Sequence, residues 1–265
     1  MNKIQLAESL PMALRYVPRH CLQSNHLRGW ATTLMVFAQL ALAIAFAAWT
    51  WRAEVSPAWL WPLSWLVTGF VLPAIFVLGH DFGQLSVFRQ RWLNSALGHL
   101  CFLPALYPFH AWRFAHDAHH KYTNKLNPKH ELYDENTWLL ETLEEYTDRS
   151  IDVPLPRWLY YLTRVVLPIG SLLYLIKFLY RPAILREAPR APVYRSYAFL
   201  AIGAPALAAL IYFALIFTGH TPAESLLGIL HFWVLPTIFL QIWMVSYTYL
   251  QHTASDSRFF TPEEW

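Results

Sequence analysis

Four long segments without a charged side chain constrain this chain more than any other feature of its sequence. They run over Trp30–Trp51, Ala58–Gly79, Ala198–Phe217 and Leu226–Tyr247, and none contains Lys, Arg, Asp or Glu. A helix needs about 20 predominantly apolar residues to cross the hydrocarbon core of a bilayer. We therefore expect four transmembrane helices. Short connections follow the first and third segments, which predicts two helical hairpins.

The composition agrees with an integral membrane protein. Of the 265 residues, 56% are hydrophobic and only 14% are charged, whereas about 25% are charged in a typical soluble domain. The net charge of +3 is too small to indicate a nucleic-acid partner. Cys21 and Cys101 lie far apart and lack CxxC spacing, so we expect neither a disulfide framework nor a thiolate metal site.

The positive charges predict which side of the membrane each connection faces. Every Lys and Arg except Arg52 lies in the N-terminal segment, in residues 81–197 or in the C-terminal tail. Loops rich in Lys and Arg face the cytoplasm. We therefore expect a multi-pass protein with both termini and the central region on the cytoplasmic side.

Two further apolar stretches are less suited to crossing a membrane. Leu93–Phe109 is short and contains His99 and two prolines, so we expect an interfacial or re-entrant segment. Trp158–Tyr180 contains Arg164 and Lys177 among aromatic and leucine side chains, a pattern typical of a helix that lies in the membrane surface. Six true spans are the alternative. The expected fold is one all-α domain over residues 1–265, with four spans, interfacial helices and a histidine-rich cytoplasmic cap.

Five of the twelve histidines are candidate metal ligands. They are His80 after the second span, His116, His119 and His120 in the motif HDAHH, and His252 after the fourth span. Positions i, i+3 and i+4 share one helix face, and neutral imidazole is a good ligand for iron, zinc or copper. The predicted topology brings all five to the same side of the membrane. The alternative is a solvated loop that happens to be rich in histidine.

Acidic side chains adjoin these histidines. Asp81 and Asp117 each follow a candidate ligand directly, and Asp134 and Glu135 lie further along the central region. A histidine that binds a metal usually donates its other ring N–H to a carboxylate or carbonyl. Asp81 and Asp117 are therefore candidates to orient the ligands, although each is equally well explained as an ordinary surface charge.

Four segments together resemble the membrane fatty-acid desaturases, particularly the acyl-lipid omega-6 (Δ12) type. They are GHDFGQLSVF, WLNSALGHLCFLPALYPFHAWRFAHDAHHKYTN, YDENTW and YLQHTASD. In this resemblance His80 matches the first histidine of the family's first box. The second box is matched by His116, His119 and His120, and His252 matches a further iron ligand after the fourth span.

The resemblance implies a di-iron centre with histidine ligands, which uses O2 to place a cis double bond in an acyl chain. It also implies a membrane acyl lipid as substrate and a separate electron donor such as ferredoxin or cytochrome b5. The chemistry agrees with this, because an unactivated C–H bond gives acid–base or nucleophilic catalysis nothing to act on. A redox metal must carry such a step.

The chain departs from the family pattern at two places. The family's first box is HDxGH, but position 84 is Gln84, which we treat as a replaced ligand. The family also carries another HxxHH after the fourth span, and no such motif occurs before Trp265. We therefore expect an incomplete ligand set and a C-terminally truncated chain, which leaves its activity open.

Alternatives to a desaturase stay open at this point. A hydroxylase or ketolase of the same polyhistidine superfamily would share the motifs, and a degenerate, non-catalytic membrane protein that binds lipid or a partner subunit would explain Gln84. A haem carrier is less favoured, because only His231 lies within a predicted span. We expect His99 and His110 to be structural, and His231 to face either helix packing or a lipid tunnel. We expect His20, His26, His130 and His220 to lie at the surface.

Overall fold

The computed structural model describes residues 16–18, 25–52, 57, 59–126, 156–180, 188–252, 257–261 and 263–264, and most of them are helical. The helices, with π-helical segments labelled η, are α2 (His26–Trp51), α3 (Leu60–Gly83), α4 (Arg91–Phe102), α5 (Phe109–Lys121), α7 (Arg157–Tyr161), η3 (Leu162–Val166), α8 (Ile169–Tyr174), η4 (Leu175–Leu179), α10 (Arg190–Phe217), α11 (Pro222–Ile229), η5 (Leu230–Val234) and α12 (Leu235–His252). Within these ranges there is no β-sheet. One isolated bridge pairs Lys125 with Phe260.

Four helical stretches are long and apolar enough to cross a membrane, as predicted. They are α2, α3, α10 and the continuous run Pro222–His252 formed by α11, η5 and α12. Each reaches beyond the predicted apolar segment at one or both ends, because a helix continues through polar residues that suit helical geometry. As a result His80 lies in the last turn of α3 and His252 is the final residue of α12.

Local hydrogen bonds define where several of these helices begin. The Asn25 side chain accepts a hydrogen bond from the Arg28 backbone N–H at 3.1 Å and so caps α2. At the start of α11, Thr221 and Glu224 form a reciprocal capping box, with Pro222 in the first turn. Such caps satisfy N–H groups that have no partner inside the helix.

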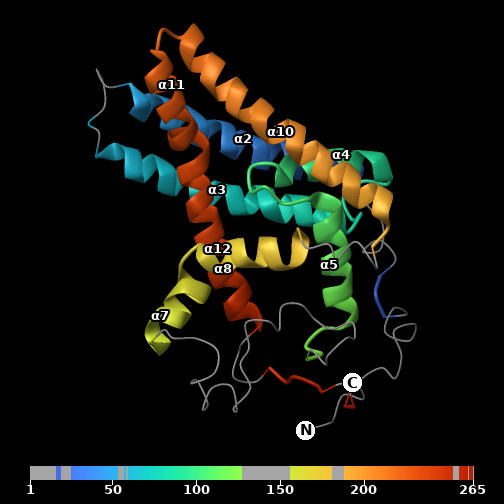
Figure 1. Ribbon diagram of the computed structural model, residues 1–265. Helices are drawn as coiled ribbons and strands as arrows, with labels where there is room; N and C mark the ends of the chain where they lie inside the picture. The colour runs from blue at the N-terminus through green and yellow to red at the C-terminus, as the bar shows by residue number, and fades with distance from the viewer. Residues whose placement is uncertain are drawn as a thin grey trace.

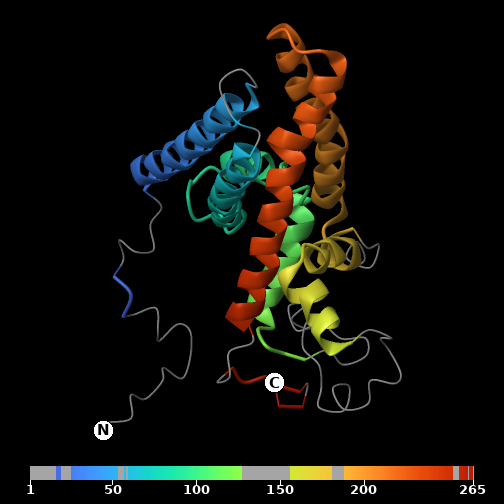
Figure 2. The same cartoon turned by 90° about the vertical axis from the view of Figure 1, so that its left-hand side faces the viewer.

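Figures 1 and 2 show the arrangement of the long helices. Helix α2 packs along α3, α10 packs beside α11, and α12 packs across α3. The pair α2–α3 and the helix α12 cross at a steep angle in Figure 1. Helices α5 and α12 descend on the same side of α3, and their C-terminal ends lie near each other in both views. The predicted hairpins and cytoplasmic sidedness remain predictions.

An aromatic core joins α3, α4 and α5. The ring of Phe102 stacks on Phe76 at 4.5 Å and meets Trp112 edge-on at 4.8 Å. Two glycines allow the helices to approach: a Cβ added at Gly79 would lie 2.6 Å from the Phe102 ring, and one at Gly98 only 2.2 Å from Phe109. Close packing of this kind leaves little freedom in how α5 sits against α3.

The two shorter apolar stretches are broken into short helices. Helix α4 ends at Phe102 and α5 begins at Phe109, so Leu93–Phe109 is a helix followed by a turn. The stretch Trp158–Tyr180 is interrupted where Leu167 adopts an extended conformation before Pro168, as expected for a residue that precedes proline. Their position relative to a membrane remains a prediction.

Candidate metal centre

Three helices contribute the five candidate histidines. His80 comes from the last turn of α3, His252 from the end of α12, and the HDAHH motif from the second half of α5. The aromatic core holds α5 against α3, which brings His80 and the HDAHH motif together. The packing of α12 across α3 brings His252 to them.

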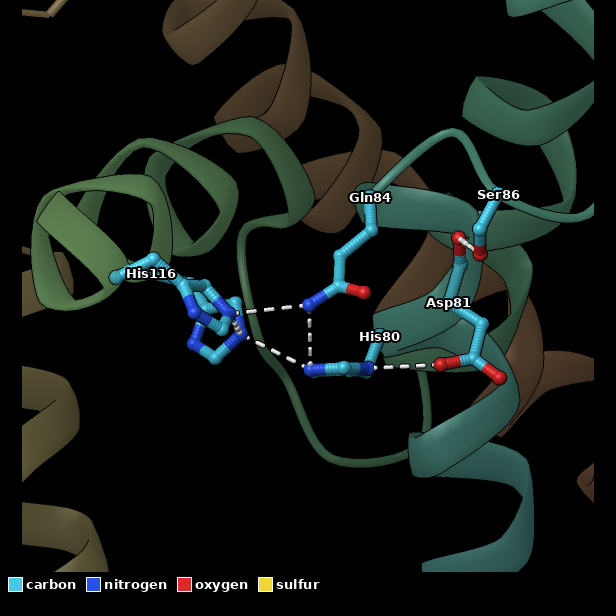
Figure 3. Close-up of polar contacts among 6 residues, drawn as sticks. His80, Asp81, Gln84, Ser86 and His116 are labelled. Atoms are coloured by element: carbon cyan, nitrogen blue, oxygen red, sulfur yellow. Dashed lines mark hydrogen bonds and ion pairs between the residues drawn. The ribbon is translucent and has the colours of Figure 1, made fainter. Parts of the chain in front are cut away.

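The ring nitrogens of His80, His116 and His120 converge on one point. Their ligand atoms all lie within 4.8 Å of one another. The Nε2 atom of His116 is 2.9 Å from Nε2 of His80 and 2.9 Å from Nε2 of His120. Figure 3 shows the imidazole of His116 turned toward that of His80. Three imidazoles from two helices therefore form one cluster.

The remaining two candidates form a second group beside the first. The rings of His119 and His252 meet edge-on with their centroids 4.9 Å apart. The His119 ring is also 5.6 Å from the His116 ring, and its side chain is buried. The structure thus brings all five predicted histidines together, in a group of three and a group of two.

The two candidate orienting acids differ in what they contact. An Asp81 carboxylate oxygen lies 2.9 Å from Nδ1 of His80 (Figure 3). Asp117 instead lies 3.8 Å from the guanidinium of Arg113, one turn earlier in α5. Asp81 is therefore placed to accept the His80 Nδ1–H, which leaves the Nε2 lone pair of His80 facing the cluster. Asp134 and Glu135 lie outside the described residues, as do His20, Cys21 and His130.

Gln84 also reaches into the group of three. Its side-chain nitrogen lies 3.2 Å from Nε2 of His80 and 3.0 Å from Nε2 of His120. Figure 3 shows the amide nitrogen of Gln84 turned toward the imidazole of His80 and toward the imidazoles of α5. Gln84, which the resemblance indicates as a replaced ligand, therefore has its side chain at the cluster.

The surroundings of His116 keep its imidazole in the metal-binding form. Burial lowers the pKa of His116 to about 3, with further lowering by the nearby His80, His120, His119 and His252. A neutral imidazole offers a lone pair to a metal, whereas a protonated one does not.

The spacing of the nitrogens fits a metal ion. With metal–nitrogen bonds of about 2.1 Å, two nitrogens at right angles lie about 3.0 Å apart, and about 3.4 Å apart at the tetrahedral angle. Two of the three separations in the cluster, both 2.9 Å, match the first value. Imidazole suits iron as well as zinc and copper, so the described residues fit the iron implied by the resemblance.

An apolar cavity of about 970 Å³ opens beside the histidines. All five candidate histidines line it, together with apolar side chains from α2, α3 and α12 such as Val36, Phe76 and Met244. Pockets for small ligands occupy about 300–1,000 Å³ and are lined mostly by apolar groups. The cavity can therefore hold a long apolar chain with one part of it next to the histidine cluster.

Trp112 is a site residue that the sequence argument did not identify. It is one helical turn before His116, and its ring stacks on the His116 ring with centroids 4.6 Å apart and planes at 14°. Its position four residues before His116 could have identified it, because residues at i and i+4 of a helix share a face. The tryptophan fixes the plane of a candidate ligand.

The other histidines take part in packing away from this cluster. His99 contacts the Ser95 carbonyl at 2.7 Å and the Ser196 hydroxyl at 3.2 Å, and the backbone N–H of His110 donates to the same hydroxyl at 2.8 Å. Both are structural, as predicted. His231 is buried, receives a hydrogen bond from the indole of Trp65 at 3.0 Å and lies 3.1 Å from the Ala47 carbonyl. Packing is therefore the correct one of its two predicted roles. Two others predicted at the surface, His26 and His220, are half-buried.

Comparison with known proteins adds evidence that is independent of this geometry. A family model described as fatty acid desaturase matches residues 56–265. An sn-1 oleoyl-lipid 12-desaturase of Arthrospira platensis is 33% identical over 249 residues, which is 94% of this chain and 64% of the relative.

Two further relatives bear related names. A chloroplastic omega-6 fatty acid desaturase of Spinacia oleracea is 28% identical over 280 residues, covering 98% of this chain and 54% of the relative. An sn-1 acyl-lipid omega-3 desaturase (ferredoxin) of Nostoc sp. (strain 36) is 27% identical over 261 residues, covering 94% of this chain and 64% of the relative. The chain thus spans between about half and two thirds of the length of these relatives.

Proposed function

This chain belongs to the fatty acid desaturase family, in its acyl-lipid omega-6 (Δ12) group, and on that premise we propose that it is the membrane body of an enzyme that desaturates lipid acyl chains. The observation that carries the proposal is the gathering of five histidines from three helices at the wall of one apolar cavity. A metal site in contact with an apolar cavity of this size suits a reaction at a methylene group.

The proposed cofactor is iron. His80, His116 and His120 would hold one ion, and His119 and His252 would contribute to a second. Bound iron supplies the redox chemistry, with O2, that removes two hydrogens from adjacent methylenes and leaves a cis double bond. The residues of the chain have the separate tasks of binding, orientation and exclusion of water.

Those tasks follow from the contacts of the cavity. Its apolar wall favours an acyl chain over water, because burial of apolar surface is worth about 25 cal/mol per Å². Asp81 holds the orientation of His80 through the Nδ1 contact at 2.9 Å, and Trp112 holds the ring plane of His116. These residues would keep the ligands in place while the acyl chain enters.

The proposed substrate is an oleoyl chain of a membrane glycerolipid, as the name of the Arthrospira platensis relative suggests. The proposed electron donor is a separate protein of the ferredoxin type, which appears in the name of the Nostoc relative. We further propose that residues 1–265 form one domain and that the histidines and both termini face the cytoplasm.

Lipid analysis tests the function. The gene is expressed in a host that makes oleoyl lipids but no dienes, together with ferredoxin and its reductase, and the fatty acids are analysed by gas chromatography and mass spectrometry. We expect 18:2 lipid from the chain extended through the histidine box that the family carries after the fourth span, and none from its His116→Ala variant expressed at the same level. Hydroxylated or keto products would assign the protein to another reaction of the superfamily. Unchanged lipids, with good expression and bound iron, would refute the proposal.

A further inference from the structure

We propose that the carbonyl oxygen of the Gln84 side chain is itself a metal ligand, which makes the group of His80, His116 and His120 a site of three imidazoles and one amide oxygen. The proposal rests on the proposed function only for the identity of the metal as iron. The arrangement of the four side chains carries the rest.

The position of Gln84 aims its side chain at the cluster. Gln84 directly follows α3, one turn after His80, and its backbone N–H donates to the His80 carbonyl at 3.0 Å. Residues at i and i+4 of a helix share one face, so both side chains point the same way. On the facing helix α5, the Nε2 atom of His120 lies 3.0 Å from the nitrogen of the same amide.

The hydrogen bonds around the Gln84 amide indicate which of its atoms, oxygen or nitrogen, would face a bound metal. The Asp81 contact takes the Nδ1–H of His80, so the Nε2 atom of neutral His80 carries a lone pair. Without a metal, the Gln84 NH₂ can donate to the lone pairs of His80 and His120. A metal ion that takes these lone pairs removes the acceptors, and its positive charge repels the amide N–H groups.

Rotation of the amide resolves this conflict. The oxygen and nitrogen of a glutamine amide are nearly the same size and exchange places by a half-turn of the terminal torsion. The oxygen then stands where the nitrogen now lies, about 3 Å from two imidazole nitrogens, which is the separation of neighbouring ligands on one ion. The existing backbone therefore needs no adjustment to offer an oxygen ligand.

An amide oxygen changes what the site prefers. Carbonyl oxygen is a harder donor than imidazole and suits Mn²⁺ and similar ions, whereas imidazole suits zinc, copper, iron and nickel. We therefore expect the amide to lower the preference of the site for Zn²⁺ over Mn²⁺. A glutamine that merely fills space would affect neither the affinity nor this preference.

Metal titration of the purified full chain, without lipid or electron donor, tests the proposal. Dissociation constants for Mn²⁺, Co²⁺ and Zn²⁺ are measured by chelator competition, and the visible bands of the Co²⁺ form are recorded. Gln84→Ala is expected to weaken Co²⁺ binding about tenfold or more and to change the bands. Gln84→His is expected to tighten Zn²⁺ more than Mn²⁺. Gln90→Ala, at an exposed glutamine outside the cluster, should change neither quantity.

A double-mutant cycle assigns the effect to the right group of histidines. If Gln84 binds the same ion as His120, the losses of metal-binding free energy caused by Gln84→Ala and His120→Ala will not be additive. The losses caused by Gln84→Ala and His252→Ala will be additive. Gln84 is exposed, so its variants should fold, and thermal unfolding of the metal-free proteins verifies this.

Two results would overturn the proposal: unchanged Co²⁺ affinity and bands in a folded Gln84→Ala protein, or no metal binding by the unaltered chain. Because no turnover is measured, a failure of desaturation would leave this test intact. Conversely, the protein could be catalytically active while Gln84→Ala leaves its Co²⁺ affinity and bands unchanged. That result would refute the ligand role of Gln84 and leave the proposed function standing.

Discussion

The indole ring of Trp112 lies almost parallel to the imidazole of His116, with 4.6 Å between ring centroids. The same indole meets the ring of Phe102 in the aromatic core at 4.8 Å and the edge of His80 at 5.6 Å. One side chain therefore connects the packing of α3, α4 and α5 with the orientation of two candidate metal ligands. Stability and metal binding should be coupled through it.

Substitutions of Trp112 should separate these two effects. Trp112→Ala is expected to destabilise the protein by about 3–5 kcal/mol, because it leaves a cavity in the core. Trp112→Phe keeps most of the packing but offers a smaller stacking surface, so its metal affinity should fall about tenfold with a small change in unfolding temperature. Trp92→Phe, at an exposed tryptophan of α4, is the control. Equal metal affinity in the Trp112→Phe and unaltered proteins would contradict the positioning role.

The two aspartates that follow histidines should behave differently. Asp81→Asn weakens the acceptor of the His80 Nδ1–H, and the expected result is a 10- to 100-fold loss of metal affinity. Asp117→Asn removes only a 3.8 Å ion pair between an exposed carboxylate and the half-buried Arg113, so metal affinity should stay the same. Chelator competition on the purified variants measures both. A similar loss in the two variants would show that general charge, and not the His80 contact, is responsible.

Gly98 should tolerate no side chain. A Cβ at this position would lie 2.2 Å from the Phe109 ring, and we expect Gly98→Ala to destabilise the protein by about 1–3 kcal/mol and to reduce its metal content. Gly203→Ala is the matched control, because its Cβ would meet the flexible end of Leu103 at 3.0 Å and the Phe199 ring at an ordinary contact distance of 3.7 Å. Thermal unfolding and metal analysis are the measurements. Identical unfolding temperatures for the two variants would refute the packing argument.

Stability should fall in acid partly because of His110. Burial, together with the neighbouring His99, Arg113 and Arg195, lowers the pKa of His110 from 6.5 to about 4. Between these values the unfolded chain binds a proton that the folded chain does not, so stability is lost as the pH falls from about 6.5 toward 4. Below about 4 both states are protonated and this contribution no longer changes.

A His110→Asn variant tests this assignment. Metal-free protein is unfolded by heat at several pH values between 7.5 and 4.5, and the variant should show a shallower dependence on pH than the unaltered chain. Some dependence should persist, because burial also lowers the pKa of His116 and of His99. An unchanged slope would show that His110 does not titrate in this range.

Much of this protein follows from its sequence by local rules. The absence of charge over some 20 residues predicts each span, because no water in the hydrocarbon core can solvate a charge. The 3.6-residue period of a helix places His116 and His120 on one face, and the structure shows their nitrogens 2.9 Å apart. The predicted ends of the helices are less accurate than their centres, because polar residues such as His80 and Asp81 continue α3 beyond its apolar part.

The contacts between helices required the tertiary structure. Asp81 and Asp117 have the same local pattern in the sequence, but only Asp81 lies on a histidine ring, because the direction of each side chain depends on what packs around its helix. The approach of Gln84 to His120 likewise depends on the angle at which α5 crosses the end of α3. That angle results from the packing of Phe102, Phe109 and Trp112 around two glycines.

The sequence by itself determined that the chain is a helical membrane protein and which histidines are available to a metal, because span length and helical period are local properties, and the resemblance of its motifs indicated the desaturase family. Only the tertiary structure decided that three of these histidines and Gln84 share one point while His119 pairs with His252. The physical reason is that such distances depend on close packing between segments far apart in the chain, and no local pattern specifies that packing.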